Sequence, residues 1–149
     1  MNAPANPRAA QFYDTNILLY AVSDEESEAP KRAVARALVA RREFGLSVQV
    51  LQEFYVNVTR SKAVRRNPLM TRAQGQLAVV ALMRKTIAPN TPTILLDALA
   101  LHQRFALSFW DASIVAAAKS LDASTLYSED MQHGQSIEGI TIINPFLAV

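Results

Sequence analysis

Cysteine is absent from the 149-residue sequence, and other residue types with special chemistry or geometry are scarce. Without cysteine the chain has no disulfide, no thiolate metal site and no cysteine nucleophile. A zinc site would have to combine carboxylates with the chain's 2 histidines, which is a poor set of zinc ligands. Only 4 glycines and 7 prolines are present, which excludes collagen-like and low-complexity chains.

Long apolar runs and a strong net charge are also missing. No apolar segment approaches the length needed to span a membrane. Residues 1–10 contain proline and asparagine but no apolar core, so they do not have the pattern of a signal peptide. The formal net charge of +2 permits a polyanionic partner without requiring one. We therefore expect a cytoplasmic protein that does not contact a membrane.

Hydrophobic residues make up 50% of the chain and charged residues 19%, which is typical of a folded globular domain. We expect residues 1–9 to form a flexible tail and residues 10–149 to form one domain with its own core. Short segments typical of strands occupy 11–13, 46–48, 125–127 and 140–143. Segments typical of helices separate them, at 15–22, 29–43, 49–60, 72–84, 93–105 and from 110 onward. Strands that alternate with helices predict an α/β fold whose parallel sheet is covered on both faces.

The same patterns predict which side chains point inward. Gly45 is expected to end the 29–43 helix as a C′ glycine, and Trp110 is expected in the core. Thr71 is expected to cap a helix with one inward apolar face, made of Ala73, Leu77, Val80 and Ala81. Glu53 lies opposite the apolar face of its helix, so periodicity alone predicts that it is a surface charge.

One carboxylate lies at a junction between a strand and a helix. Asp14 directly follows the 11–13 strand and precedes the helix that starts at Thr15. In an open α/β sheet the carboxyl ends of strands face the crevice in which ligands bind. A carboxylate is costly to bury there unless it is paired or binds a cation. Thr15 and Asn16 add a hydroxyl and an amide that can orient Asp14 or a bound water, and the alternative is that Asp14 only caps the helix.

Further acids occupy comparable positions. Asp130, or its neighbour Glu129, follows the 125–127 strand, and Asp111 opens a helix expected beside the sheet. Such positions gather on one edge of a doubly wound sheet, where crowded carboxylates need a cation to stay ionised at neutral pH. Oxygen ligands favour Mg²⁺ or Mn²⁺, which activates water and stabilises charge on a phosphoryl group. The alternatives are that Asp111 is an N-cap and that Glu129 and Asp130 are turn acids.

Four segments with these acids follow one another along the chain: Asp14-Thr15-Asn16-Ile17-Leu18-Leu19-Tyr20, Gln52-Glu53-Phe54-Tyr55, Trp110-Asp111-Ala112-Ser113-Ile114 and Ser128-Glu129-Asp130. In order and spacing the set resembles the PIN domain, most closely the VapC-type ribonuclease toxins of bacterial toxin–antitoxin pairs. The resemblance covers residues 11–146. It implies a three-layer α/β/α sandwich with a central parallel sheet, dependence on Mg²⁺ or Mn²⁺, and cleavage of single-stranded or structured RNA.

The resemblance also implies roles for individual residues. The catalytic acids carried over are Asp14, Glu53, Asp111 and Asp130, of which Asp14, Asp111 and Asp130 would bind the metal. Residues that would support these acids are Thr15, Asn16 and Ser128. Glu53 would face the cleft rather than bulk water, and Asp130 rather than Glu129 would be the fourth acid. The implied mechanism is in-line attack of a metal-activated water on a phosphodiester, without a covalent intermediate.

The resemblance implies partners as well. A basic segment that follows the Glu53 helix is a candidate contact for RNA phosphates, or else a solvated loop, and it contains Arg60, Lys62, Arg65 and Arg66. We expect a cognate antitoxin whose Arg or Lys side chain reaches the acids and competes with the metal. We also expect a homodimer. Three apolar residues could form its face or help to form the antitoxin groove, unless they are core residues: Leu18, Leu19 and Val22.

Two other functions remain open from the sequence. A Mg²⁺-dependent phosphatase acting on small substrates would use a similar acidic pocket. A non-catalytic RNA- or protein-binding module could keep the metal site as a relic, although the presence of all four acids speaks against this.

Overall fold

The computed structural model of the chain describes residues 6–61 and 67–149. Its strands are β1 (Gln11–Tyr13), β2 (Gly45–Ser47), β3 (Thr86–Ala88), β4 (Thr125–Tyr127), β5 (Ser136–Ile137) and β6 (Ile140–Ile143). They form a single sheet in the order β3-β2-β1-β4-β6-β5 within the described residues. In this spatial order, every neighbouring pair of strands is parallel except the last, because β5 runs antiparallel to β6.

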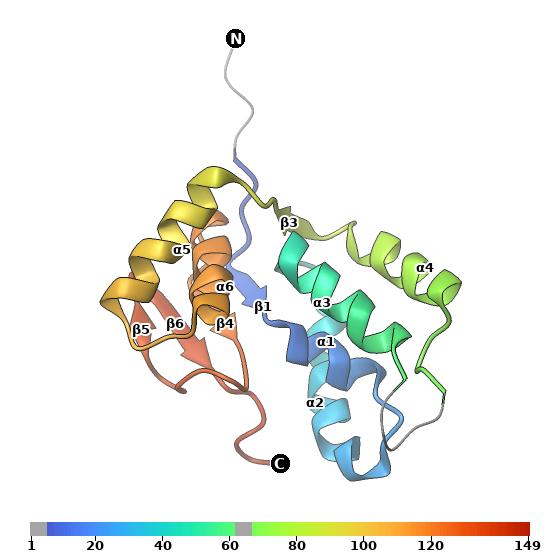
Figure 1. Cartoon of the computed structure of the whole chain (residues 1–149). Helices are drawn as coiled ribbons and strands as arrows, with labels where there is room; N and C mark the ends of the chain where they lie inside the picture. Colours follow the sequence, from blue (N-terminus) through green and yellow to red (C-terminus); the bar gives the residue numbers. More distant parts are fainter. Residues whose placement is uncertain (1–5, 62–66) are drawn as a thin grey trace.

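Helices lie on both sides of this sheet, as Figure 1 shows. They are α1 (Thr15–Val22), α2 (Ala29–Val39), α3 (Val48–Thr59), α4 (Arg72–Leu82), α5 (Pro92–Arg104) and α6 (Phe109–Ser120), with a short 3₁₀ turn at Glu26–Glu28. Helix α6 packs against β2, β3 and β6 and carries α5 on its outer side, whereas α1 packs against α2 and α3. The arrangement confirms the predicted α/β/α sandwich around a mostly parallel sheet. None of the helices in the described ranges is long and apolar enough to cross a lipid bilayer.

The core ties the central strand to helices on both sides. Successive strand side chains point to opposite faces, and Phe12 and Tyr13 of β1 are both fully buried. The Tyr13 hydroxyl donates to the backbone oxygen of Leu38 in α2 at 2.8 Å, and its ring stacks on Phe44 at a centroid distance of 4.4 Å. On α6 many of the buried side chains are small, among them Ala112, Ala116 and Ala118, which are fully buried beside Val115 and Ile114. Small side chains allow α6 to approach the sheet closely.

The prediction for Gly45 is wrong. Helix α2 ends at Val39, and Gly45 is instead the first residue of β2, where it is buried. A Cβ atom at this position would lie 2.7 Å from Leu121 Cδ1 and 3.0 Å from Ala9 Cβ, so glycine is needed for close packing rather than for a helix end. Ala9, expected in the tail, is itself buried, and its N–H donates to the Leu121 backbone oxygen at 2.9 Å.

The predicted inward face of α4 is also wrong. Thr71 does cap this helix, but Leu77 and Val80 are 71% and 55% exposed, and Ala73 and Ala81 are exposed too. The face that packs inward is centred on Gly75, with Ala78, Val79 and Leu82 beside it. A Cβ at Gly75 would meet Thr59 Cγ2 at 2.7 Å, so the glycine lets α4 approach α3. Apolar residues occur on both faces of α4, and therefore periodicity could not decide between them.

Replacing Gly45 with alanine should destabilise the fold, because the added methyl group collides with Leu121. We expect the free energy of unfolding to fall by about 1–3 kcal/mol, measured by urea denaturation. The control is the same substitution in a Leu121→Val background, which lacks the colliding Cδ1 atom, so the cost of Gly45→Ala should be smaller there. An equal cost in both backgrounds would contradict the packing explanation.

Candidate active site

The pairing of β1 with β4 places the first and last acidic segments side by side. Tyr13 is in register with Tyr127, so the residues that follow them, Asp14 and Ser128, meet at the carboxyl edge of the sheet. The Ser128 hydroxyl donates to Asp14 Oδ2 at 2.7 Å, and the Thr15 N–H donates to Asp14 Oδ1 at 2.7 Å. Asp14 therefore does cap α1, as one alternative held, but its second oxygen is held from the neighbouring strand.

Asp14 is a buried acid whose charge is costly. Its side chain is 5% exposed, and burial raises the pKa of Asp14 to about 6. The hydrogen bonds from Ser128 and Thr15 oppose this rise in pKa, whereas the nearby charges of Asp130 and Glu53 add to it. Such a group gains from a cation that neutralises it.

Glu53 faces the same site from α3. Its carboxylate accepts a hydrogen bond from the Thr15 hydroxyl at 2.5 Å and another from the Gln49 amide at 3.0 Å. The surface position that periodicity predicts for Glu53 is therefore wrong, and the cleft position that the resemblance implies agrees with this geometry. Residues 49, 53 and 57 form one polar stripe on α3, and this stripe lines a polar cleft. Periodicity separates apolar from polar faces, but it does not separate a cleft from bulk water.

Asp111 is not the N-cap of its helix. Ser108 caps α6, and its hydroxyl oxygen accepts a hydrogen bond from the Asp111 N–H at 3.1 Å. Asp111 sits in the first turn, with its carboxylate toward the other acids. Burial raises the pKa of Asp111, a hydrogen bond between its side chain and that of Ser108 lowers it, and the charges of Asp130 and Glu53 raise it further.

The two candidates for the fourth acid point in different directions. Asp130 lines the pocket with Asp14 and accepts a hydrogen bond from the Asn16 amide at 3.1 Å. Glu129 instead forms an ion pair with Lys31 and accepts a hydrogen bond from the Tyr20 hydroxyl at 2.5 Å. The structure therefore brings Asp130, and not Glu129, to the other acids.

These residues share one open pocket of about 290 Å³, which we call the acid pocket. Its lining includes Asp14, Thr15, Asn16, Glu53, Asp111 and Asp130. Ser128 is fully buried beneath Asp14, where its hydroxyl also accepts the Asp130 N–H at 3.2 Å. Of the described residues that line the acid pocket, none is a lysine or an arginine. Within the described part of the chain, the pocket lining therefore concentrates negative charge.

The donor set suits a hard cation, but it is not a preassembled chelate. In residues 6–61 and 67–149, no three His, Cys, Asp or Glu side chains lie close enough to one another to hold one ion between them. Mg²⁺ typically binds through one or two carboxylates and keeps several waters, so it does not require such a cluster. The carboxylates of the acid pocket therefore fit a hydrated Mg²⁺ or Mn²⁺ ion better than they fit a metal that is caged by protein ligands.

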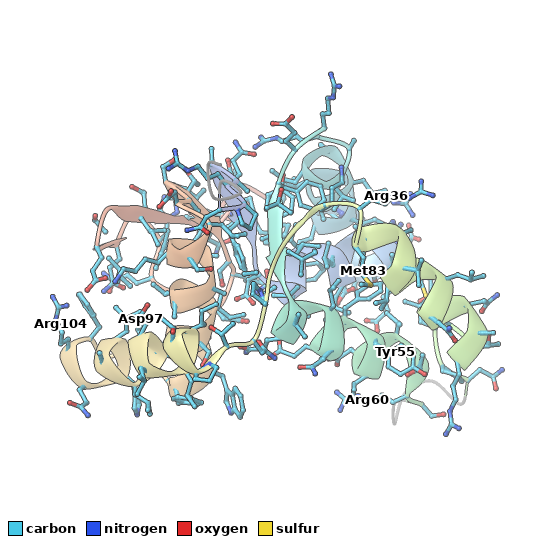
Figure 2. The ribbon with its side chains drawn as sticks, turned by 90° about the horizontal axis from the view of Figure 1, so that it is seen from above. Arg36, Tyr55, Arg60, Met83, Asp97 and Arg104 are labelled. Carbon is cyan, nitrogen blue, oxygen red and sulfur yellow. The ribbon has the colours of Figure 1, made fainter. Side chains whose placement is uncertain are left out.

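The predicted basic contacts lie outside the acid pocket. Arg60 lines a neighbouring pocket of about 250 Å³, which we call the arginine pocket, and its guanidinium donates to Asn57 Oδ1 at 3.1 Å. Figure 2 shows Arg60 at the end of α3. The remaining predicted phosphate contacts, Lys62, Arg65 and Arg66, lie outside the described residues.

Trp110 lies at the site and not in the core, so its predicted position is wrong. It is 65% exposed and lines the acid pocket beside Asp111. Helix α6 begins one residue earlier than expected, and Phe109 is the aromatic residue that packs against the core. In the sequence, the only signal that Trp110 lies at the cleft was that it directly precedes Asp111.

The pKa of Asp14 predicts an unusual pH dependence of stability. The folded protein holds the Asp14 proton up to about pH 6, whereas the unfolded chain releases it near the ordinary value of 3.8. Without metal, the free energy of unfolding should therefore fall as the pH rises from about 4 to 7, by up to about 3 kcal/mol. Asp14→Asn should remove the Asp14 part of this fall in urea titrations at each pH, and a smaller fall from Asp111, whose pKa is also raised, should remain. Asp122→Asn, at an acid whose side chain is 64% exposed, should keep the whole fall, and an unchanged slope in Asp14→Asn would contradict the assignment.

Solved structures of other proteins share this fold. A toxin–antitoxin complex from Klebsiella pneumoniae aligns with a TM-score of 0.64 and 23% identity, over 91% of this chain and 98% of that chain. VapC20 from Mycobacterium tuberculosis, named as a toxin that cleaves the sarcin–ricin loop, aligns with a TM-score of 0.57 and 18% identity, over 80% and 91%. VapBC2 from Rickettsia felis, bound to a DNA fragment from its promoter, aligns with a TM-score of 0.56 and 20% identity, over 89% and 96%.

The sequence itself places the chain in a family. No curated protein sequence matches it significantly. The family model described as the PIN domain matches residues 12–135, which contain all four acids of the acid pocket. This match confirms the resemblance that the four motif segments indicated, and the chain belongs to the PIN domain family.

Proposed function

We propose that the protein is a Mg²⁺- or Mn²⁺-dependent endoribonuclease and the toxin of a toxin–antitoxin pair. The observation that carries the proposal is the convergence of four carboxylates, from separate parts of the chain, on one open pocket: Asp14, Glu53, Asp111 and Asp130. Membership of the PIN domain family supports a nuclease. The likeness to VapC20, whose name states that it cleaves the sarcin–ricin loop, supports RNA as the substrate.

In this proposal, a hydrated metal ion would take its ligands from Asp14, Asp111 and Asp130, one or two of them directly and the rest through metal-bound water. When bound, Mg²⁺ or Mn²⁺ supplies a water of lowered pKa and offsets negative charge on the phosphodiester. Ser128 and the Thr15 N–H fix the two oxygens of Asp14, so its orientation does not depend on the ligand. The Asn16 amide likewise fixes one oxygen of Asp130.

The position of Glu53 suits a role in proton transfer. Its two oxygens are held by Thr15 and Gln49, so the carboxylate is fixed in the pocket wall by neutral partners among the residues that the structure describes. A carboxylate in that position can accept a proton from an attacking water, provided that the water lies within hydrogen-bonding reach. We propose that Glu53 acts as this general base or orients the water.

The shape of the site favours a polymer over a small phosphate ester. The acid pocket shares Asn16, Asn57 and Asp130 with the arginine pocket, so the two form a continuous depression. The arginine pocket is also lined by Glu25, Glu28 and Glu129, so a strand that crosses it would place a phosphate at Arg60 itself. A small phosphomonoester would leave this extension unused. This continuity is why we favour a nuclease over a small-substrate phosphatase.

Inhibition by an antitoxin fits the charge of the site. Because no described lining residue is basic, a lysine or arginine from a partner can approach the acids and replace the cation. The likeness to toxin–antitoxin complexes supports such a partner. We propose that the cognate antitoxin inhibits by inserting a basic side chain into the acid pocket.

A homodimer would use a different face from the one considered in the sequence. Leu18 is buried, and Leu19 and Val22 are partly buried, so these residues belong mainly to the core. Helix α5 instead exposes three leucines, Leu95, Leu96 and Leu99, at 50%, 66% and 41%. We propose that α5 carries the dimer contact, because contiguous exposed leucines favour burial against a partner.

Removing a metal-binding carboxylate should abolish RNA cleavage. With Mg²⁺ or Mn²⁺, Asp14→Asn and Asp111→Asn should each lower the cleavage rate by more than about a hundredfold, since even residues that only support metal ligands cost about 10- to 100-fold. EDTA should have the same effect on the wild-type protein, and Asp122→Asn should be without effect. Folded variants that cut RNA at the wild-type rate would overturn the site assignment. Turnover of a small phosphomonoester without RNA cleavage would favour a phosphatase.

Expression of the chain alone in bacteria should arrest growth, because an unopposed ribonuclease toxin destroys cellular RNA. The arrest should be relieved by Asp14→Asn and persist with Asp122→Asn, with growth curves and soluble protein levels as the measurements. Normal growth in the presence of soluble, RNA-cleaving protein would leave the nuclease assignment intact and contradict the toxin role.

A further inference from the structure

A second pocket adjoins the acid pocket on the side away from Arg60. It lies between α3, α5 and the start of α6, and its volume is about 460 Å³, within the range of pockets that hold small molecules. We call it the aromatic pocket. Gln49 and Trp110 line both this pocket and the acid pocket, so the two are contiguous.

The wall between the two pockets is the exposed ring of Trp110. This residue precedes Asp111 in the first turn of α6, which fixes the ring beside the acids. Phe109 supports it through an edge-to-face contact, with ring centroids 5.2 Å apart and planes at 66°. A large aromatic ring left 65% exposed beside a polar site offers a surface for stacking.

The chemistry of the aromatic pocket suits a nucleobase rather than a phosphate. Apolar side chains of α5, among them Ile94 and Leu95, form one wall, and no lysine or arginine is among the described lining residues. Side-chain amides of Gln49, Gln52 and Asn90 lie around the pocket. Amides can hydrogen-bond the edge of a base whose face stacks on an aromatic ring, and single-stranded RNA is recognised mainly in this way.

We propose that the aromatic pocket binds one base of a single-stranded RNA, next to the phosphodiester that lies in the acid pocket. The proposal rests on the proposed nuclease function for the position of that phosphodiester. The substrate strand would then pass over three contiguous pockets: a base beside Trp110, the reacting phosphate at the acids, and a further phosphate near Arg60. Trp110 is a substrate-binding residue in this arrangement and takes no part in the chemistry.

A second copy of the chain is the competing occupant of this pocket. The exposed leucines Leu96 and Leu99 lie on α5 but are not among the residues that line the pocket. A dimer contact centred on these two leucines leaves most of the pocket lining free, and Leu95 is the residue that belongs to both surfaces. The pocket also opens toward the acids rather than forming a flat face, which favours a base of the substrate over a partner surface.

Trp110 is the only tryptophan in the chain, so its fluorescence reports directly on the pocket. A short single-stranded RNA of mixed sequence, added at low ionic strength in EDTA or in Ca²⁺, should quench the emission. The same RNA with an abasic site at each position in turn should lose the quenching at one position. That position should lie beside the bond that the wild-type protein cuts in Mn²⁺.

Variants separate stacking from a structural role of Trp110. By anisotropy of a labelled RNA, Trp110→Ala should weaken binding between roughly fivefold and a hundredfold, and Trp110→Phe should recover much of the loss because it keeps a ring. The control Leu77→Ala removes an exposed leucine of α4 that lines none of the three pockets, and it should leave RNA binding unchanged.

The outcomes distinguish this proposal from the proposed function. RNA cleavage without quenching in either buffer, or without an effect of any abasic site, would overturn the base pocket and leave the nuclease standing. Quenching that depends on one base, in a protein that cuts no RNA, would support the base pocket and overturn the nuclease. Emission that changes with protein concentration, responds to Leu96→Ala and ignores RNA would show that a second copy occupies the pocket.

Discussion

The hydrogen bond from Ser128 to Asp14 is the contact on which the site depends. It joins the ends of two neighbouring parallel strands, and it is possible only because β1 and β4 pair in the register that sets Tyr13 opposite Tyr127. The same hydroxyl accepts the N–H of Asp130, so one buried side chain fixes two of the four acids. A shift of either strand by one residue would separate these groups, because it would turn every side chain to the other face.

The rest of the molecule holds mutually repelling acids together. The charges of Asp130 and Glu53 raise the pKa of both Asp14 and Asp111, which means that each acid makes its neighbours harder to ionise. Close packing elsewhere offsets that cost: alanines bring α6 onto the sheet, and Gly45 and Gly75 remove side chains where elements must touch. Glu129 would be a further charge beside this group, but Lys31 and Tyr20 hold it away.

Most of the architecture could be predicted from the sequence because strands and helices alternate with clear periodicity. The bounds of β1, α1, β4 and β6 agree with the expected segments. The strands β3 and β5 were missed, because Thr86–Ala88 lies directly before the chain-breaking Pro89 and the two residues of β5 are too few to show a period. The errors at α4 and Trp110 share a cause, because hydrophobicity predicts burial and cannot identify apolar residues that a fold leaves exposed. Glu53 shows the opposite case, because polarity predicts exposure to solvent and cannot identify a position in a cleft. Only the family resemblance placed this residue at the cleft.

The short strands that were hardest to predict form the two edges of the sheet. In the part of the chain that the structure describes, β3 ends the sheet on one side with three residues and β5 ends it on the other with two. An exposed sheet edge is a template on which another chain can add a strand, and its risk grows with its length and flatness. Edges this short offer few free backbone groups, and the reversed direction of β5 also ends the parallel ladder. Molecules of this protein at high local concentration should therefore have little tendency to aggregate by pairing of their sheet edges.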